Sequence, residues 1–164
     1  MAIRYKAVNA SAEAPDPFAV LSSGNTRIDI QAYDVPLYTV PVGCTAKVNY
    51  LRMVQGRVYG YYVANDSTGY ESTRTISPGA YLSLRTKNGT IFADLYSLSD
   101  SANVAQSEID VSEKFLYLNE GDQLFLSHLA ASYSTGSETR PVFSRLSIMK
   151  KPGILASIIE EYQS

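Results

Sequence analysis

The sequence predicts an all-β fold, namely an antiparallel, jelly-roll-like β-sandwich with an extended N-terminal arm and a short C-terminal helix. Apolar and polar residues alternate through most of the 164-residue chain, which is the pattern of strands with one buried face. Turn-forming residues interrupt these runs roughly every ten residues, as they do in sandwiches and barrels. Between residues 26 and 150, the predicted sandwich domain, we therefore expect about eight or nine strands and little helix.

Residues 1–25 are expected to form the arm. Pro15 and Pro17 exclude a regular helix or a central strand from this segment. The plain alternative is a flexible tail, since chain ends are often poorly ordered. We favour an arm that lies over a neighbouring subunit, anchored by the apolar residues Phe18, Val20 and Leu21.

The first predicted strand of the sandwich domain is RIDIQAY, in which Ile28 and Ile30 share one face. LYTV follows, and the turn at residues 41–43 leads into the long run CTAKVNYLRMVQ. Both faces of this run carry apolar groups, which indicates a strand covered on both sides. The next strand is GRVYGYYVA, where Gly60 suggests a bulge or a close approach of another backbone.

Two hairpins are expected in the second half of the domain. ESTRTI and AYLSLRT are strand-like, and Asn88-Gly89, the strongest hairpin signal in the chain, joins AYLSLRT to TIFADLYSL. A turn at residues 119–122 joins IDVSEKFLYL to QLFLSHLAAS, and VFSRLSIMK completes the strand set.

Residues 151–164 are predicted to be a helical tail. After Pro152-Gly153, the apolar residues of ILASIIEEYQS follow the spacing i, i+1, i+4, i+5, i+8, which is a helical stripe made of Ile154, Leu155, Ile158, Ile159 and Tyr162. A helix of about eleven residues is not stable alone in water, so the stripe must dock. It could cover an edge of its own sandwich or bind a neighbour, and we take these five residues with the three arm residues as the predicted partner-binding set.

Composition excludes some classes of function and favours others. Charged residues make up 18% of the chain, and it has thirteen tyrosines and no tryptophan. Tyrosine suits half-buried strand faces and protein interfaces, because one end is apolar and the other forms hydrogen bonds. The net charge is −2 and no basic cluster is present, which disfavours nucleic acid as a partner. No apolar run approaches the ~20 residues of a membrane helix, so no membrane partner is expected.

Catalytic, metal and cofactor sites have little support in the sequence. The chain has one histidine, His128, which lies in a strand-like run, and one cysteine, Cys44, which directly follows a turn. A structural histidine and a small buried cysteine are the simpler interpretations of these two residues. The carboxylates are scattered, and no metal-ligand spacing or phosphate-binding glycine loop occurs. We therefore expect a protein that is not an enzyme.

The segment LYTVPVGCTAKVNYLRMVQ, with the later turn LNEGDQL, resembles a pattern in small structural proteins of tailed bacteriophages. The resemblance covers roughly residues 35 to 130. It implies a β-sandwich in the virion, assembled in the host cytoplasm, on the capsid surface or in tail parts, often as a trimer, with no catalytic residues. This chain differs from that pattern in Cys44 and in its predicted C-terminal helix.

These observations predict a capsid decoration, or cement, protein that binds the major capsid protein or other virion proteins through its two ends. A tail, collar or fibre component is the alternative within the same class. A carbohydrate-binding module is the alternative from another class, with Tyr59, Tyr61, Tyr62 and Tyr70 around the loop at residues 65–69 as a sugar platform. Absence of tryptophan weakens that interpretation, since sugar stacking often uses it.

Overall fold

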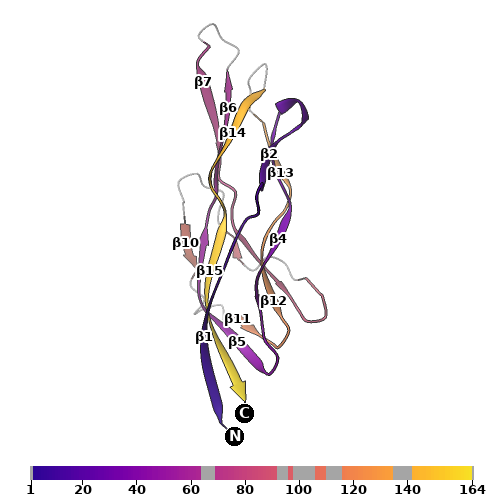
Figure 1. Ribbon diagram of the computed structural model, residues 1–164, viewed down its shortest axis with the longest axis vertical. Helices are drawn as coiled ribbons and strands as arrows, with labels where there is room; N and C mark the ends of the chain where they lie inside the picture. Colours follow the sequence, from indigo (N-terminus) through magenta and orange to yellow (C-terminus); the bar gives the residue numbers. More distant parts are fainter. Residues whose placement is uncertain are drawn as a thin grey trace.

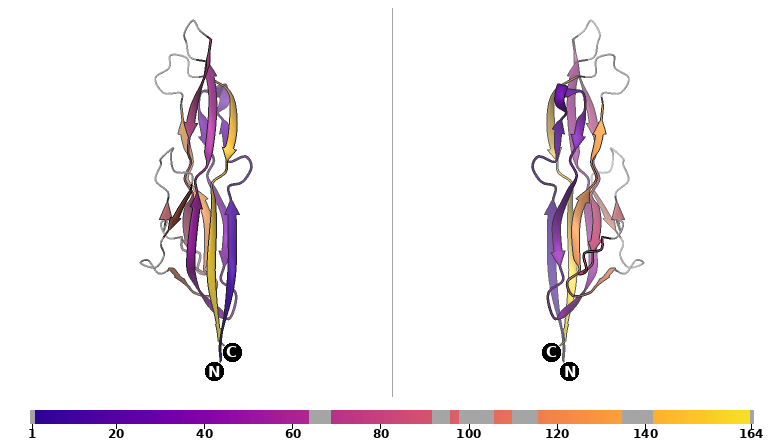
Figure 2. Two further views of the ribbon diagram at one scale, coloured as in Figure 1. Left: turned by 90° about the vertical axis from the view of Figure 1, so that its left-hand side faces the viewer. Right: turned by 90° about the vertical axis from the view of Figure 1, so that its right-hand side faces the viewer.

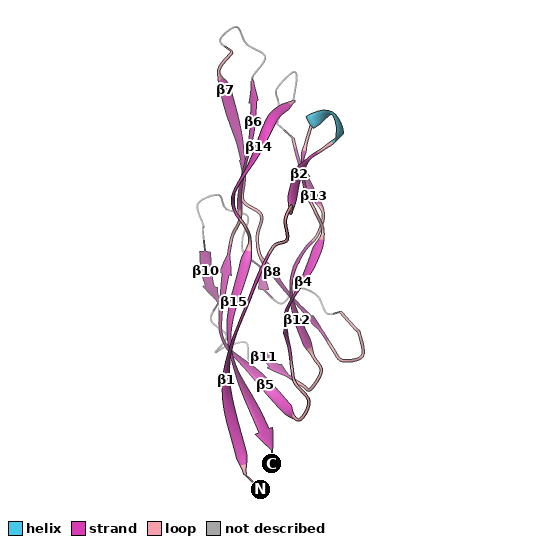
Figure 3. Cartoon of the chain, in the orientation of Figure 1, coloured by secondary structure: helices cyan, strands magenta, loops and turns pink. Residues whose placement is uncertain are grey.

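The structure, a computed structural model, describes residues 2–63, 69–91, 96–97, 106–109, 116–134 and 142–163. Over these ranges the chain is all-β, as predicted, and its one helical element is a short 3₁₀ turn at Ser23–Asn25, drawn in cyan in Figure 3. The described strands are β1 (Ile3–Glu13), β2 (Ala19–Leu21), β3 (Ile28–Ile30), β4 (Tyr33–Thr39), β5 (Cys44–Val54), β6 (Arg57–Val63), β7 (Glu71–Ile76), β8 (Tyr81–Arg85), β9 (Tyr96–Ser97), β10 (Gln106–Ile109), β11 (Leu116–Leu118), β12 (Gln123–His128), β13 (Ala131–Tyr133), β14 (Phe143–Lys150) and β15 (Gly153–Gln163).

The described strands form four antiparallel sheets in an elongated molecule (Figure 1). Two sheets make up the half that contains both chain ends, here called the terminal half: β1-β15-β5-β10, where β11 also pairs with β5, and β4-β12-β8-β9. The other two, β13-β3-β2 and β14-β6-β7, make up the distal half. The consecutive strands β5 and β6 therefore belong to different halves, and so do β14 and β15.

Four strands of one half continue into the other after a break of two residues, namely β3 into β4, β5 into β6, β12 into β13 and β14 into β15. The breaks form a waist in which the backbone is closely packed. Gly56 donates its N–H to the carbonyl of Pro78, and a Cβ on Gly56 would lie 2.7 Å from Cδ of Pro152. The buried Gln55 amide donates to the carbonyl of Ser77 at 3.0 Å. These contacts hold the connecting segments of the waist against one another.

Each half has its own hydrophobic cluster. The terminal cluster contains residues from both sheets of that half, including Leu51 on β5, Leu126 on β12 and Ile158 on β15, all fully buried. The distal cluster is smaller and centres on Phe18 and Phe143. Burying large apolar side chains from two facing sheets is the main source of stability in such a fold.

The predicted C-terminal helix is wrong, because residues 153–163 form the strand β15. Ile154, Ala156 and Ile158 alternate inward and lie opposite Met53, Leu51 and Val48 of β5. A run this rich in isoleucine fits a strand period as well as a helical one. The neighbouring strands β1 and β5 select the strand conformation, since they hydrogen-bond β15 on both sides.

The N-terminal segment is extended, as expected for an arm, but it lies against its own chain. Residues 3–13 form β1, which pairs with β15 in an unbroken antiparallel register from Ile3 opposite Gln163 to Glu13 opposite Gly153. The chain then crosses to β2 through residues 14–18. The two ends of the chain therefore stabilise each other and share a sheet with β5.

The hairpin predicted at Asn88-Gly89 is confirmed, whereas the close neighbours of Gly60 are side chains and not the predicted backbone. The Asn88-Gly89 turn follows β8, with Gly89 at a φ of +84° and Arg85 bridged to Ile91, although most of the predicted partner strand lies outside the described residues. Gly60 sits where a Cβ would lie 2.4 Å from Cδ1 of Ile28 and 2.6 Å from Cε1 of Phe143. Only glycine fits at this point of the distal core.

Candidate interaction surface at the terminal end

Two turns close the terminal half beside the chain ends. Glu120 in the β11–β12 turn accepts a hydrogen bond from the backbone N–H of Gly43 in the β4–β5 turn, at 3.0 Å. Val40 donates to the carbonyl of Asp122, and Gly121 donates to the carbonyl of Val40. Gly43 and Gly121 both adopt a φ of +84°, the conformation that glycine makes accessible in tight turns. The two motifs of the phage resemblance are thus hydrogen-bonded to each other.

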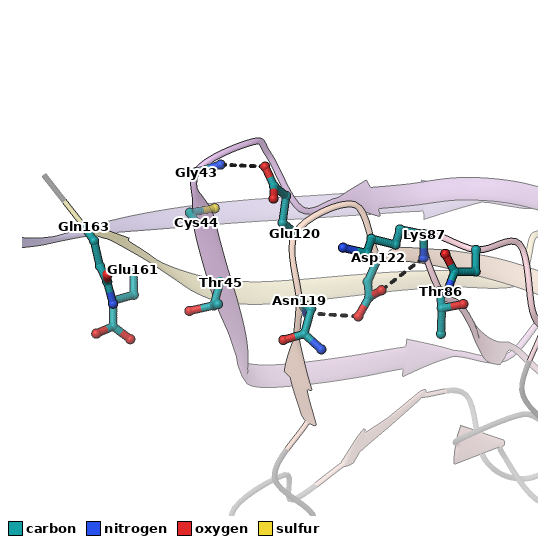
Figure 4. Close-up of a pocket in the computed structure, with 11 residues that line it drawn as sticks. Gly43, Cys44, Thr45, Thr86, Lys87, Asn119, Glu120, Asp122, Glu161 and Gln163 are labelled. Carbon is teal, nitrogen blue, oxygen red and sulfur yellow. Dashed lines mark hydrogen bonds between the residues drawn. The ribbon is translucent and has the colours of Figure 1, made fainter.

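A depression of about 620 Å³ lies beside these turns (Figure 4). Its lining comes from the start of β5, the turn after β8, the β11–β12 turn and the end of β15: Gly43, Cys44, Thr45, Thr86, Lys87, Asn88, Asn119, Glu120, Asp122, Glu161 and Gln163. The depression therefore combines segments that are far apart in the sequence.

Two carboxylates of this depression, Asp122 and Glu120, accept hydrogen bonds from backbone N–H groups. Asp122 accepts from the N–H of Asn119 at 2.9 Å and from the N–H of Lys87 at 3.2 Å, and Glu120 accepts from Gly43 (Figure 4). Such bonds fix turns in place. Among the described residues, no group of three or more histidine, cysteine, aspartate or glutamate side chains has a metal-binding arrangement.

A buried carboxylate lies just inside the terminal end. Glu160 on β15 is 3% exposed and accepts two tyrosine hydrogen bonds, from Tyr38 on β4 at 2.5 Å and from Tyr162 at 2.8 Å. Burial of a carboxylate is costly unless it is hydrogen-bonded, and bonds to a charged acceptor are stronger than neutral ones. The Tyr38 bond joins the two sheets of the terminal half, so Glu160 braces them against each other.

This arrangement shifts the titration of its neighbours. Burial, followed by the hydrogen bond to Glu160, raises the pKa of Tyr38. The hydrogen bond to Glu160, followed by burial, raises the pKa of Tyr162 to about 12. Burial also raises the pKa of the Cys44 thiol, whose Sγ lies 3.5 Å from the carbonyl oxygen of Pro41. A thiol with a raised pKa is a poor nucleophile, which fits the structural interpretation of Cys44.

The predicted partner-binding residues fall into two groups. Phe18, Ile154 and Ile158 are buried in the cores of their own chain, so their side chains are inaccessible to a partner in this structure. Leu155 is 41% exposed, and the remaining four, Val20, Leu21, Ile159 and Tyr162, are partly buried. The alternation of β15 explains the difference, because odd-numbered residues there face away from the terminal cluster.

The most exposed apolar side chains of the two terminal strands lie at the start of β1. Ile3 is 49% exposed and Tyr5 is 68% exposed. Both strands lead to the end of the molecule where the termini lie together (Figure 1). β1 is also the last strand of its sheet, so its second edge pairs with no described strand. The sequence analysis named Phe18, Val20 and Leu21 as contact residues and did not consider Ile3 and Tyr5, because it expected an unpaired arm where the structure has the paired strand β1.

Two of the four candidate sugar-binding tyrosines lie together. Tyr59 and Tyr61 of β6 share the outer face of the sheet β14-β6-β7, with ring centroids 6.4 Å apart and an edge-to-face geometry. The Arg145 guanidinium covers the Tyr61 ring at 3.6 Å. Tyr62 instead packs against the distal cluster, edge-on to Phe143. Tyr70 is exposed, and residues 65–68 of the adjacent loop lie outside the described residues.

His128 has a structural environment. Its ring stacks on Tyr33 with centroids 5.8 Å apart and meets the edge of Tyr81 at 5.2 Å. These rings belong to β4 and β8, the two strands that flank β12. The histidine thus helps to hold three strands together at the waist end of the sheet.

Known proteins add nothing to this geometry: no known family matches the sequence, and no curated protein matches it. Within the described part of the chain, no helix has the length and apolar character needed to cross a membrane.

Proposed function

We propose that this chain is a non-enzymatic structural protein of a tailed-phage virion, most simply a decoration protein bound to the outside of the head. The proposal rests on the sequence resemblance at residues 35–130 and on one structural observation. An elongated all-β body holds both chain ends, with the exposed residues Ile3 and Tyr5, at one end. That end would contact the major capsid protein or another virion protein.

The proposed body is a β-sandwich. Each hydrophobic cluster draws side chains from two sheets, which is what face-to-face packing requires. A jelly-roll strand order remains part of the proposal. In this revised mechanism the ends do not lace over neighbours as loose segments, since β1 and β15 are paired along their whole length. Adhesion would come from a preformed surface, which avoids the entropy cost of ordering a free arm.

The location in the virion can be tested by protein copy number. Quantitative mass spectrometry of purified virions should find hundreds of copies per particle for a head decoration protein. A few copies or about a dozen would indicate the tail, collar or fibre alternative instead. Absence of the chain from purified particles would overturn the proposal.

The contact surface can be tested by rebinding of purified protein to particles that lack it. The double substitution Ile3→Ser and Tyr5→Ser should weaken binding at least about tenfold, because exposed apolar and aromatic anchors supply most interface energy. Leu129→Ser is the control, since Leu129 is also a large apolar side chain and is even more exposed, at 80%, but lies at the waist. Equal binding by both variants would remove the terminal end as the contact surface.

A carbohydrate-binding function is a second candidate, supported by Tyr59 and Tyr61. Beside Tyr59 lies a cavity of about 240 Å³ whose lining includes Ser77 and Met149. Retention of the protein on polysaccharide columns, lost in Tyr59→Ala and Tyr61→Ala but kept in Tyr5→Ala, would support this function. No retention on any column would remove it.

A further inference from the structure

The edge of β1 that faces away from β15 pairs with no described strand, and its hydrogen-bonding pattern is defined by the register of β1 and β15. Ala14 donates its N–H to the carbonyl of Pro152, and the register runs without a break from there along β1 and β15. In an antiparallel pair, alternate residues direct both backbone groups to the same neighbour. Even-numbered residues of β1 therefore bond β15, and the odd-numbered residues direct their N–H and C=O groups away from it: Ile3, Tyr5, Ala7, Asn9, Ser11 and Glu13.

The strand β1 itself lacks the usual features that protect an edge against strand pairing. Natural edge strands are commonly short, bulged, interrupted by proline or charged along their length. β1 has eleven residues, contains no proline and pairs with β15 without a register shift. Its charges lie towards the ends, at Arg4, Lys6 and Glu13, while residues 7–12 are small or uncharged. In both views of Figure 2, β1 runs along the outer margin of the terminal half.

We propose that β1 pairs with β1 of a second copy of this chain, antiparallel and across a two-fold axis at Val8. In any two-fold antiparallel pair, opposed residue numbers have a constant sum. The outward-directed odd residues must face each other to exchange hydrogen bonds, so that sum must be even. A sum of 16 pairs all eleven residues of β1, with Ile3 opposite Glu13 and Val8 opposite its own copy.

The side chains are compatible with this register. Arg4 would lie opposite Ala12 and Lys6 opposite Ala10, so no like charges oppose each other across the axis. On the other face, Tyr5 would lie opposite Ser11 and Ala7 opposite Asn9, which leaves room for the tyrosine ring to pack along the partner strand. Every residue of β1 thus lies opposite a compatible residue of a second copy. For this reason we propose a second copy of the chain, rather than a foreign peptide, as the partner of this edge.

Pairing would join two terminal sheets into one, in the order β5-β15-β1-β1-β15-β5. An isologous contact of this kind closes after two copies, so it gives a dimer and not the trimer that the resemblance implied. The inference concerns the isolated protein and holds or fails independently of the proposed virion function.

The substitution Ala7→Pro tests the pairing. It removes an outward N–H but no bond to β15, because Ala7 is an odd-numbered residue, and proline is tolerated at such edge positions. Ala7→Val is the matched control, since it enlarges the same side chain and keeps the N–H. Sedimentation should show wild type and Ala7→Val as concentration-dependent dimers, with dimerisation of Ala7→Pro weakened at least about tenfold.

Amide hydrogen exchange identifies the edge involved. On raising the wild-type concentration, the amides of Tyr5, Ala7, Asn9 and Ser11 should become protected, while the even-numbered amides of β1 stay protected throughout. Retained even-numbered protection in Ala7→Pro shows that this variant still folds. A wild-type monomer at about millimolar concentration, a dimer unaffected by Ala7→Pro, or outward amides protected only by an added peptide would each overturn the inference.

Discussion

The two halves of the molecule fill their interiors differently, although strands run from one into the other. Among the described residues, the terminal cluster has sixteen buried members, most of them aliphatic, on strands of up to eleven residues. The distal cluster has eight, and Phe18 and Phe143 are its largest side chains. Its sheet β13-β3-β2 consists of three-residue strands. A core built on few large residues depends more heavily on each, so the distal half should be the less stable one.

The largest expected effect comes from Phe143→Ala in the distal core. Loss of a fully buried phenylalanine ring should lower the free energy of unfolding by about 4 kcal/mol, measured by urea denaturation. Its neighbour Val142 is half-exposed, so Val142→Ala should cost less than about 0.5 kcal/mol. Amide exchange should rise in β3, β6 and β14 while β5 and β15 keep their protection. An equal rise in both halves would show that they unfold as one unit.

The next effect should come from the buried carboxylate of the terminal half. Tyr38→Phe leaves Glu160 with one hydrogen bond fewer in a buried site, which should cost about 2 kcal/mol of stability. Tyr5→Phe removes the same hydroxyl from an exposed ring and serves as the control, with a change below about 0.5 kcal/mol. If both substitutions proved equally mild in urea denaturation, Glu160 would have no bracing role.

The smallest effect concerns alkaline pH. The pKa of Tyr162 is raised to about 12 in the folded chain, against about 10 for an unfolded tyrosine. Between these values the folded state holds a proton that the unfolded state has lost, so stability falls as pH rises. Tyr162 contributes fully below pH 10, and its contribution is lost by about pH 12. Urea denaturation at pH 9, 10 and 11 should therefore show a shallower decline for Tyr162→Phe, whereas identical slopes would contradict this.

The sequence was sufficient for most of the strand content and for the turns, although the hairpin predicted across residues 119–122 is wrong, because β11 pairs with β5 whereas β12 pairs with β4 and β8. Alternation identified strands such as β5, β6, β8 and β12, and the turn residues located Gly43, Asn88-Gly89 and Gly121. These features depend on neighbours in the sequence, so one chain suffices to predict them. Gly60 was recognised as a special position, but the sequence predicted a bulge or an approaching backbone, and the structure instead places the side chains of Ile28 and Phe143 there.

The chain ends could not be predicted in the same way. Residues 154–162 satisfy both a helical and a strand period, and only the presence of β1 and β5 as partners selects the strand. That pairing joins residues about 150 positions apart, which no local pattern records. The Glu160 site was missed for the same reason, because Tyr38 is 122 positions away and a glutamate next to another glutamate looks like a solvated pair.

The shared position of the two ends has a mechanical consequence. If a load is applied to both termini, β1 and β15 are pulled apart from the same end, so their hydrogen bonds break one pair at a time. A load between one terminus and the distal half instead acts along the strands and strains many bonds together. The protein should thus peel open easily when its ends are separated, and resist tension transmitted along its length.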